Sequence, residues 1–467
     1  MAPKKINHYH ATVLLDLFVR QDYTQPMRQR RFFLFLMLVL VSLAACSPGH
    51  LGGNEIAFIR DGHLWTIDPS GTNAFAAVTQ DTPVVGYSWS PTHQILVFRT
   101  LDDAFAKTAA ARQLVANAVT GQITDTPSTV NTIGIDGGSA IPIMLSSPDV
   151  QYSNPMWNAT GTRLIYRQEP TASHTAENAF WWVSQNDQPG GIAAKNLPGS
   201  DSLLSLSYID SSAIGITKRG IFTVSLTGTN AHFLLPPLTG HPLPATLERI
   251  LWQPHHTQPF LLYAELAPTK SSAQQIAETA LTTQLILHAP DGKDKTLATC
   301  TCTQFTWSPD GNTVLYSTGQ KDTLVNITTG SSFTFSVERN SVPYWSPNSK
   351  FLLVDGLHTL QVVQVAEHQQ QVLLSDGVTP INSTTLAEVN VLLQPVPNSL
   401  WATDSNHFLF LTHNRLLWQG HMLGKGLYTV TVDAHGQPQG MPAVVDTGND
   451  TQAGWSYQDA NTSFLYE

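Results

Sequence analysis

Residues 307–317 have the sequence Trp-Ser-Pro-Asp-Gly-Asn-Thr-Val-Leu-Tyr-Ser, which is the clearest structural signal in the chain. Pro309, Asp310 and Gly311 are turn formers: proline presets φ, aspartate hydrogen-bonds nearby backbone, and glycine tolerates positive φ. The residues after the turn are mainly apolar and aromatic, as expected of a buried strand. The stretch therefore predicts a strand that ends at Trp307, a tight turn, and an antiparallel strand that follows it.

The same unit recurs along the chain. Its first strand ends in a tryptophan, with turn formers and then an apolar strand behind it, at Trp89, Trp157, Trp252, Trp307, Trp345, Trp401 and Trp455. In one further unit Tyr208 takes the place of the tryptophan, and the average spacing is then about 52 residues. A repeat of this length is typical of one four-stranded propeller blade, and tryptophans at equivalent positions indicate packing between blades.

These observations predict an all-β chain folded as a single β-propeller of four-stranded blades. Residues 55–59 indicate a second strand, yet no strand with a Trp turn precedes them. The last residues of the chain, around Trp455 and Phe464, supply the missing inner strand. The N- and C-terminal strands are therefore expected to share a blade and close the ring. Counting this composite blade gives eight blades, with seven as the alternative.

The motif also carries a family resemblance. Residues 307–317 resemble the repeat of TolB-like (WD40-like) β-propellers, and Trp89-Ser90-Pro91 and Trp345-Ser346-Pro347 are weaker copies. The resemblance covers residues 54–467. It implies a propeller fold, and TolB itself is a periplasmic propeller that partners envelope proteins.

The N-terminus indicates export and a lipid anchor. Three arginines, Arg28, Arg30 and Arg31, precede an apolar run over residues 32–41 that is too short to cross a bilayer as a stable helix. The run ends in Ser-Leu-Ala-Ala-Cys at residues 42–46, which resembles the lipobox of bacterial lipoproteins. The resemblance implies that Cys46 bears the lipid and becomes the first mature residue. An uncleaved anchor helix and a plain secretory signal are the alternatives.

The predicted domains follow from this assignment. Residues 1–26 are an upstream extension or a mis-assigned start, with Met27 as the alternative to Met1. Residues 27–45 are the signal peptide, 46–53 a short tether, and 54–467 the propeller. We expect the mature protein on the outer face of the bacterial cytoplasmic membrane, or on the outer membrane or cell surface.

Charge limits the partners. Charged residues are only 12% of the chain, and beyond residue 45 there remain 18 basic and 32 acidic residues, a net charge of −14. Such a surface repels phosphate backbones and anionic lipid headgroups. We therefore expect no nucleic-acid partner, a membrane contact only through the lipid on Cys46, and a monomer that binds an envelope protein, peptide or glycan.

Few residues indicate chemistry. The chain lacks common metalloprotease, hydrolase and phosphate-binding motifs, so no catalytic residue, metal or cofactor is predicted. Residues ahead of the repeat tryptophans are expected to line the central channel, and the candidate pore or ligand contacts are Glu248, Arg249 and Gln304. The candidate exposed aromatic contacts are Trp181, Trp182 and Trp418. The state of Cys300 and Cys302 stays open, because an i, i+2 disulfide needs a distorted backbone.

Together these features predict a lipid-anchored, extracytoplasmic propeller that acts as a binding or scaffold module. Its rim loops would present recognition residues on a rigid ring. The alternatives are an envelope enzyme, a lyase or hydrolase that acts on polysaccharide with its site in the pore, and a sensor whose small ligand fills the channel.

Overall fold

The structure is a computed structural model of the whole chain, which divides into two units, Met1–His50 and Leu51–Glu467. It describes residues 55–456 with gaps, the longest of which are 118–125, 171–179, 186–194, 197–202, 268–281 and 376–399. The predicted signal peptide, the tether and the last predicted strand at residues 463–466 lie outside the described residues.

The described strands of the second unit form eight antiparallel sheets. Written from the innermost strand outward, the first four are β34 (Asp450–Trp455), β1 (Ile56–Arg60), β2 (His63–Ile67), β3 (Phe75–Val78); β4 (Val84–Trp89), β5 (Ile95–Leu101), β6 (Ser128–Gly134), β7 (Ile141–Met144); β8 (Val150–Tyr152) with β9 (Met156–Trp157), β10 (Arg163–Pro170), β11 (Phe180–Gln185), β12 (Lys195–Asn196); and β13 (Leu203–Ile209), β14 (Ser212–Thr217), β15 (Gly220–Ser225), β16 (His232–Leu235).

The other four follow in chain order. They are β17 (Ile250–Trp252), β18 (Leu261–Leu266), β19 (Thr283–His288), β20 (Asp294–Cys300); β21 (Gln304–Trp307), β22 (Thr313–Ser317), β23 (Lys321–Asn326), β24 (Ser332–Ser336); β25 (Val342–Trp345), β26 (Phe351–Asp355), β27 (Thr359–Gln364), β28 (Gln369–Ser375), extended by β30 (Leu416–Trp418) and β31 (His421–Leu423); and β29 (His407–Thr412), β32 (Gly426–Thr431), β33 (Ala443–Asp446). In the last sheet the inner strand is reduced to a bridge between Trp401 and Phe408.

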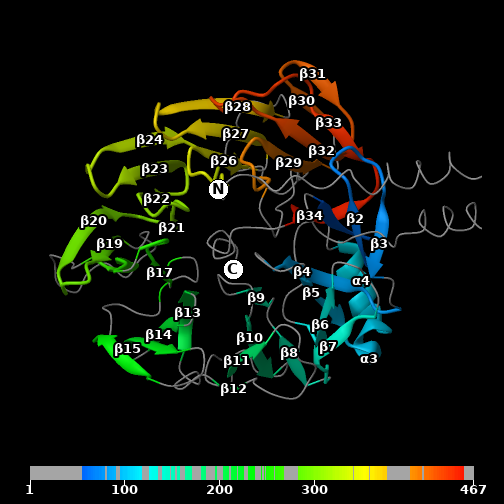
Figure 1. Cartoon of the computed structure of the whole chain (residues 1–467), viewed down its shortest axis with the longest axis horizontal. Helices are drawn as coiled ribbons and strands as arrows, with labels where there is room; N and C mark the ends of the chain where they lie inside the picture. Colours follow the sequence, from blue (N-terminus) through cyan, green and yellow to red (C-terminus); the bar gives the residue numbers. More distant parts are fainter. Residues whose placement is uncertain are drawn as a thin grey trace, which may run out of the picture. The chain divides into compact units, whose positions relative to one another are not determined.

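The first strands of the sheets surround the centre of a ring, and later strands lie progressively farther out (Figure 1). The all-β propeller predicted from the repeat is therefore confirmed. The shared blade is also present: β1 pairs with β34, with Ile56 opposite Trp455 and Arg60 opposite Asp450. Each predicted tryptophan or tyrosine unit begins a sheet where the sequence indicated.

The Trp turn is rigid because its side chains satisfy its own backbone. The Ser308 hydroxyl donates to Asp310 Oδ1 at 2.5 Å and accepts from the Thr313 N–H at 2.9 Å. Gly311 adopts a φ of 71°, and a Cβ there would lie 2.6 Å from the Pro254 carbonyl oxygen of the preceding sheet. Only glycine meets both the positive φ and this close approach.

Adjacent Trp turns are hydrogen-bonded to each other. The Asp310 N–H donates to Ser349 Oγ at 2.9 Å, and the Asn348 N–H donates to Ser405 Oγ at 3.1 Å. The indole N–H of Trp401 donates to the Tyr344 carbonyl of the preceding inner strand at 3.0 Å. In these three sheets the sequence motif therefore joins neighbouring sheets, beyond forming its own turn.

Most of the repeat tryptophans are buried between sheets, as the sequence indicated. Trp307 packs with Leu251, Leu262 and Leu285 of the preceding sheet, and Trp401 stacks on Phe351 with ring centroids 5.9 Å apart. Burying one such aromatic side chain contributes about 2–3 kcal/mol. Contacts of this kind recur at the described interfaces and make the hydrophobic core a series of clusters between sheets.

Two insertions decorate the ring. Residues 102–118 are rich in alanine and contain no glycine or proline, a composition that favours a helix. They include α3 (Asp103–Ala106) and α4 (Ala109–Asn117), between the second and third strands of a sheet. Asp102 caps α3 by accepting the N–H groups of Ala104 and Phe105 at 2.9 and 3.0 Å. Residues 272–279, whose composition also favours a helix, lie outside the described residues.

The other insertion corrects one prediction. Trp418 was expected to be an exposed aromatic contact, but it is fully buried, at 0% exposure, and stacks on Phe410 with centroids 5.8 Å apart. The hairpin β30–β31 does not project into solvent, because β30 pairs with β28 of the neighbouring sheet, Trp418 opposite Leu374. It covers part of an edge strand, which would otherwise be open to pairing with other chains.

An ion cluster lies where the ring closes. Arg60 Nε donates to Asp450 Oδ1 at 2.8 Å, and Arg60 also pairs with Asp446 at the end of the outer strand β33. The guanidinium lies 5.0 Å from the Phe58 ring centroid and 5.5 Å from that of Trp65. Arg60 therefore joins the first described strand to the last two.

We predict that Arg60→Met destabilises the protein, because it leaves the fully buried carboxyl of Asp450 without its cation. Burial raises the pKa of Asp450 to about 7, so at low pH this carboxyl is neutral and loses little when the arginine is removed. The expected loss is on the order of 2–4 kcal/mol at pH 8 and smaller at pH 5, measured by urea unfolding. Arg112→Met on α4 is the control, and equal losses at both pH values would contradict the role given to Asp450.

Candidate functional site

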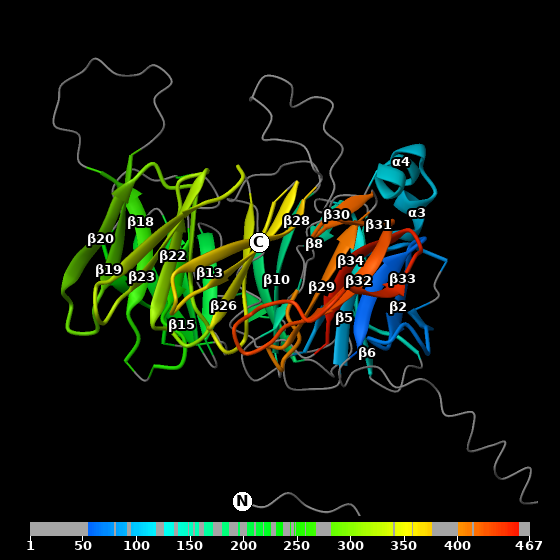
Figure 2. The ribbon, with the colours of Figure 1, turned by 90° about the horizontal axis from the view of Figure 1, so that it is seen from above.

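The two edges of the sheets differ in what they carry. We call the edge with the Trp turns the turn rim, and the opposite edge, where inner strands begin and second and fourth strands end, the loop rim. The helices α3 and α4 lie at the loop rim, and so do the C-terminal ends of β18 and β28 (Figure 2). Long connections on a rigid scaffold are where recognition residues are usually found.

A row of polar residues follows the loop rim across two neighbouring sheets. In the first sheet Gln304 of β21 is opposite Ser317 of β22, and Ser317 is opposite Asp322 of β23. Gln304 Nε2 then donates to the Ser341 carbonyl at 3.0 Å, which joins the row to the start of β25 in the next sheet. There Val342, the neighbour of Ser341, is opposite Asp355 of β26. We call Gln304, Ser317, Asp322, Ser341 and Asp355 the loop-rim row.

Several polar atoms of the loop-rim row are buried without a partner. Asp322, Ser341 and Asp355 have side chains that are 0%, 4% and 8% exposed. Among the described residues, no group meets strict hydrogen-bond geometry with the carboxylate oxygens of Asp322, with Ser341 Oγ, or with Asp355 Oδ1. The Ser317 hydroxyl is nevertheless close enough to Asp322 to interact with its carboxylate. Leaving such an atom unpaired costs about 1–3 kcal/mol, so three residues of this kind in one row require a physical explanation.

Burial makes the two aspartates of the row weak acids. Desolvation raises the pKa of Asp322 to about 6, and the nearby Ser317 hydroxyl opposes the rise. Desolvation also raises the pKa of Asp355 well above its ordinary value, and the negative charge of Glu338 adds to the effect. Burial therefore favours the protonated form of Asp355, which donates a hydrogen bond as well as accepting one.

Glu338 is held beside Asp355 by the turn between β26 and β27. Its carboxylate accepts the His358 N–H at 3.0 Å and the Thr359 hydroxyl at 2.5 Å. A Cβ on Gly356 would lie 2.9 Å from the Glu338 carboxyl carbon, so glycine leaves the space that this carboxylate occupies. Asp355 and Glu338 form a pair of carboxyls in unequal environments, one buried and incompletely paired and one hydrogen-bonded.

The three candidate pore residues differ in where the structure places them. Gln304 begins an inner strand, as expected, but its amide joins two inner strands through Ser341. Arg249 directly precedes β17 and is partly buried. Glu248 lies outside the described residues. The structure therefore brings Gln304 into the loop-rim row and leaves Arg249 at the start of another sheet.

The remaining predicted residues are placed only in part. Trp181 and Trp182 lie on β11, opposite Arg167 and Tyr166 of β10, but their side chains lie outside the described part of the structure. Cys46 also lies outside it. No helix in the described ranges is both long enough and apolar enough to span a membrane.

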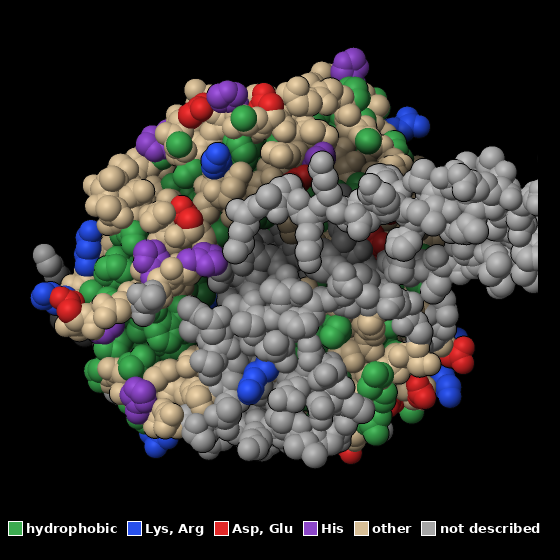
Figure 3. Space-filling model, in the orientation of Figure 1, with side chains coloured by type: hydrophobic (Ala, Val, Ile, Leu, Met, Phe, Trp, Pro, Cys, Tyr) green, Lys and Arg blue, Asp and Glu red, His purple; other side chains and the backbone are tan. Residues whose placement is uncertain are grey.

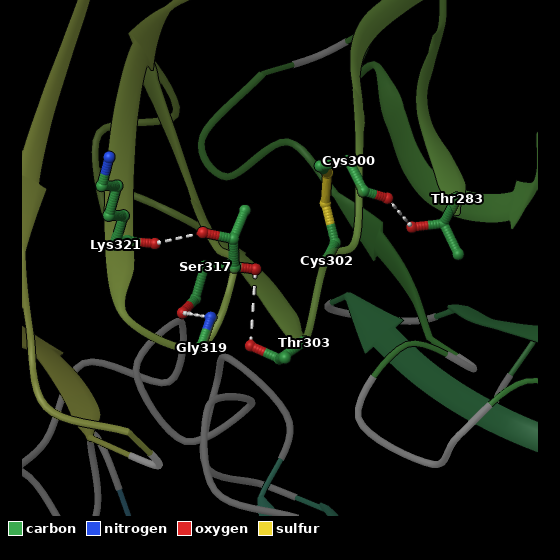
Figure 4. Close-up of a disulfide and its surroundings, with 8 residues drawn as sticks. Thr283, Cys300, Cys302, Thr303, Ser317, Gly319 and Lys321 are labelled. Atoms are coloured by element: carbon green, nitrogen blue, oxygen red, sulfur yellow. Dashed lines mark hydrogen bonds between the residues drawn. A yellow bond between two sulfur atoms is a disulfide. The ribbon is translucent and has the colours of Figure 1, made fainter. Parts of the chain in front are cut away.

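Cys300 and Cys302 form a disulfide in the connection from β20 to β21, next to the loop-rim row (Figure 4). Thr303 follows directly, and its N–H donates to the Ser317 carbonyl at 2.8 Å. The disulfide therefore constrains the backbone just before the inner strand that carries Gln304. It answers the question that the sequence left open about these two cysteines.

Sequence reasoning missed Ser317, Asp322, Ser341, Asp355 and Glu338. Ser317 and Asp322 flank a short hairpin between two strands, and this position predicts cross-strand neighbours. The burial of Asp322 and Asp355 gave no such signal, because an aspartate at a strand end is usually solvated.

The arrangement is suited to hydrogen bonding. The row offers carboxyl, hydroxyl and amide groups that match ligand hydroxyls or peptide groups. Within the residues that the structure describes, no three His, Cys, Asp or Glu side chains are grouped to hold a metal ion. On the face shown in Figure 3, the described Lys and Arg side chains are scattered and form no continuous basic patch.

Comparisons with known proteins show likeness in fold only. No family model matches the chain, and no curated protein matches its sequence. The crystal structure of Citrobacter koseri AztD is 11% identical with a TM-score of 0.46, covering 86% of this chain and 97% of that one. A eukaryotic initiation factor is 12% identical with a TM-score of 0.45 over 86% and 98%. An oligogalacturonate lyase from Vibrio parahaemolyticus is 10% identical with a TM-score of 0.39 over 83% and 94%.

We predict that Asp322→Asn removes part of the pH dependence of stability. Because the folded pKa is about 6 and the unfolded value is near 3.8, the wild type loses stability as pH rises from about 4 to 6, and the loss stays constant above that. The variant should therefore gain up to about 2–3 kcal/mol over the wild type across this range. Thermal unfolding measured at intervals of pH tests this, with the exposed Asp103→Asn as control, and parallel curves for wild type and Asp322→Asn would contradict it.

Proposed function

We propose that the chain is a lipid-anchored, extracytoplasmic binding module whose partner, a protein, peptide or glycan of the cell envelope, contacts the loop rim. The observation that carries the proposal is the loop-rim row, in which Asp322, Ser341 and Asp355 have buried atoms without partners. A partner that supplies hydroxyl or amide groups there would satisfy these atoms, and the gain would favour binding.

The rest of the structure supports this role. The ring is closed by β1 and β34, and adjacent turns are hydrogen-bonded, so the loop rim rests on a rigid scaffold. Rigid presentation reduces the entropy lost on binding. At the same rim α4 exposes Leu114 and the connection from β7 to β8 exposes Leu145, at 37% and 72%. Such groups could extend the contact beyond the polar row.

The anchor is tested by intact mass. For protein extracted from membranes of cells that express the full chain, we expect a species that begins at Cys46 and carries a diacylglyceryl group. Cys46→Ala should remove this species, and Ser47→Ala, its neighbour, should retain it. A soluble wild-type protein that lacks lipid would refute the anchor and leave the fold unaffected.

The binding role is tested by thermal unfolding in the presence of a panel of neutral and acidic oligosaccharides and of short envelope-derived peptides. A ligand that binds only the folded state raises Tm, and the rise grows with the ratio of the ligand concentration to Kd. We expect Asp355→Asn to weaken ligand affinity at least tenfold and therefore to reduce the rise in Tm. The exposed turn-rim variant Thr403→Ala should leave the rise in Tm unchanged. A ligand whose effect is the same in Asp355→Asn would place the contact elsewhere.

A second candidate function rests on the carboxyl pair Asp355 and Glu338. Two carboxyls in unequal environments are the arrangement that acid–base catalysis on polysaccharide requires. The test incubates the protein with neutral and acidic polysaccharides and measures new reducing ends and unsaturated products. Activity that is lost in Asp355→Asn would favour an enzyme over a binding module.

A further inference from the structure

The first described residue is fixed at the turn rim. Glu55 donates its N–H to Ser456 Oγ at 3.1 Å, and its carbonyl accepts the Ser456 N–H at 2.9 Å. Ser456 directly follows Trp455, the last repeat tryptophan. The chain therefore enters the ring beside a Trp turn, on the side opposite to the loop rim.

Strand β1 then runs from the turn rim to the loop rim. It runs from Ile56, opposite Trp455, to Arg60, opposite Asp450. At about 3.3 Å per residue, these strands separate the two rims by roughly 15–20 Å. The loop-rim row is therefore at least this far from the point at which the N-terminal segment enters.

The predicted anchor is close to that point in sequence. Nine peptide steps join Cys46 to Glu55, which can span at most about 30 Å when fully extended. A Gly-rich chain of this length has a root-mean-square span of roughly 15–18 Å. At its average span this segment holds a lipid on Cys46 near the turn rim, where Glu55 enters the ring, and only a nearly extended segment exceeds the distance between the two rims.

The charge of the turn rim prevents the ring from lying flat in the headgroups. Its described turns carry mainly carboxylates, with Lys293 and Lys350 as the basic residues among them: Asp68, Asp291, Asp310, Glu367, Asp404 and Asp433 are acidic. Anionic lipid repels such a surface at distances within a Debye length, about 8–10 Å. Charge therefore keeps the turn rim from lying flat on the headgroups, and the tether alone keeps this rim near the bilayer.

We infer that the anchor orients the ring with its loop rim away from the bilayer, so that the partner at the loop-rim row is a macromolecule that approaches from the aqueous side. This inference rests on the proposed lipid anchor. It favours a partner in the aqueous compartment over one embedded in the membrane beneath the ring.

The orientation is tested with two matched threonines of the last blade, Thr403 at the turn rim and Thr447 at the loop rim, both exposed. With Cys46 lipidated and Cys300 bonded to Cys302, Thr403→Cys or Thr447→Cys adds a free thiol for a fluorescent label. The labelled lipoprotein is reconstituted in vesicles of phosphatidylethanolamine and phosphatidylglycerol that contain a headgroup quencher. We expect quenching at position 403 to exceed that at 447 at least twofold.

The controls separate this inference from the anchor. Insertion of roughly thirty Gly and Ser residues between Gly52 and Gly53 should reduce the difference between the two positions, because a longer tether no longer orients the ring. Protein that does not float with the vesicles would refute the lipid anchor, and unlipidated protein coupled through Cys46 to a maleimide lipid then repeats the measurement. Equal quenching, or stronger quenching at 447, in membrane-bound protein would overturn the orientation.

Discussion

The pairing of β1 with β34 is the interaction on which the ring depends, because it joins strands that are nearly four hundred residues apart in sequence, as the separation of 390 between Arg60 and Asp450 shows. Bringing such distant segments together costs loop-closure entropy, which grows only slowly with length. Backbone hydrogen bonds, the burial of Trp455 and the Arg60 cluster offset that cost at one place. Tyr87 adds to it from the neighbouring sheet, since its hydroxyl is bonded to carbonyls of both Ala57 and Gln452.

Elsewhere in the ring, stability comes from repeated contacts between neighbours. A Trp turn contributes a buried indole on one side and backbone donors and acceptors on the other, so one short motif serves turn formation and packing together. Gly311 illustrates the constraint, because its position is limited by its own φ and by the carbonyl of Pro254 in the preceding sheet. The departures from the motif in other units are tolerated because each interface depends mainly on its two sheets.

At the loop rim, in contrast, some buried polar groups lower the stability of the fold. Buried carboxyls at Asp322 and Asp355 lower stability when they ionise, and the fold retains them beside Gln304 and Glu338. Groups that oppose folding in this way are concentrated where proteins bind or react. Together with the helices α3 and α4, they distinguish this rim from the turn rim, whose polar side chains are mainly hydrogen-bonded within their own turns. The proposed function follows from that difference between the two edges of one ring, and the proposed orientation follows from the entry of the chain at the turn rim.

The sequence by itself determined the propeller, its inner strands and the shared closing blade, because each depends on local patterns: turn formers after a tryptophan, and apolar strands on either side. It also indicated the helix after Asp102 from composition alone. Tertiary structure decided that Trp418 is buried, since the hairpin that carries it pairs with β28, a strand that belongs to the preceding sheet. It also decided the loop-rim row, because the cost of a carboxyl is set by the groups around it, and neighbours of Asp322 and Asp355 come from strands that only folding brings together.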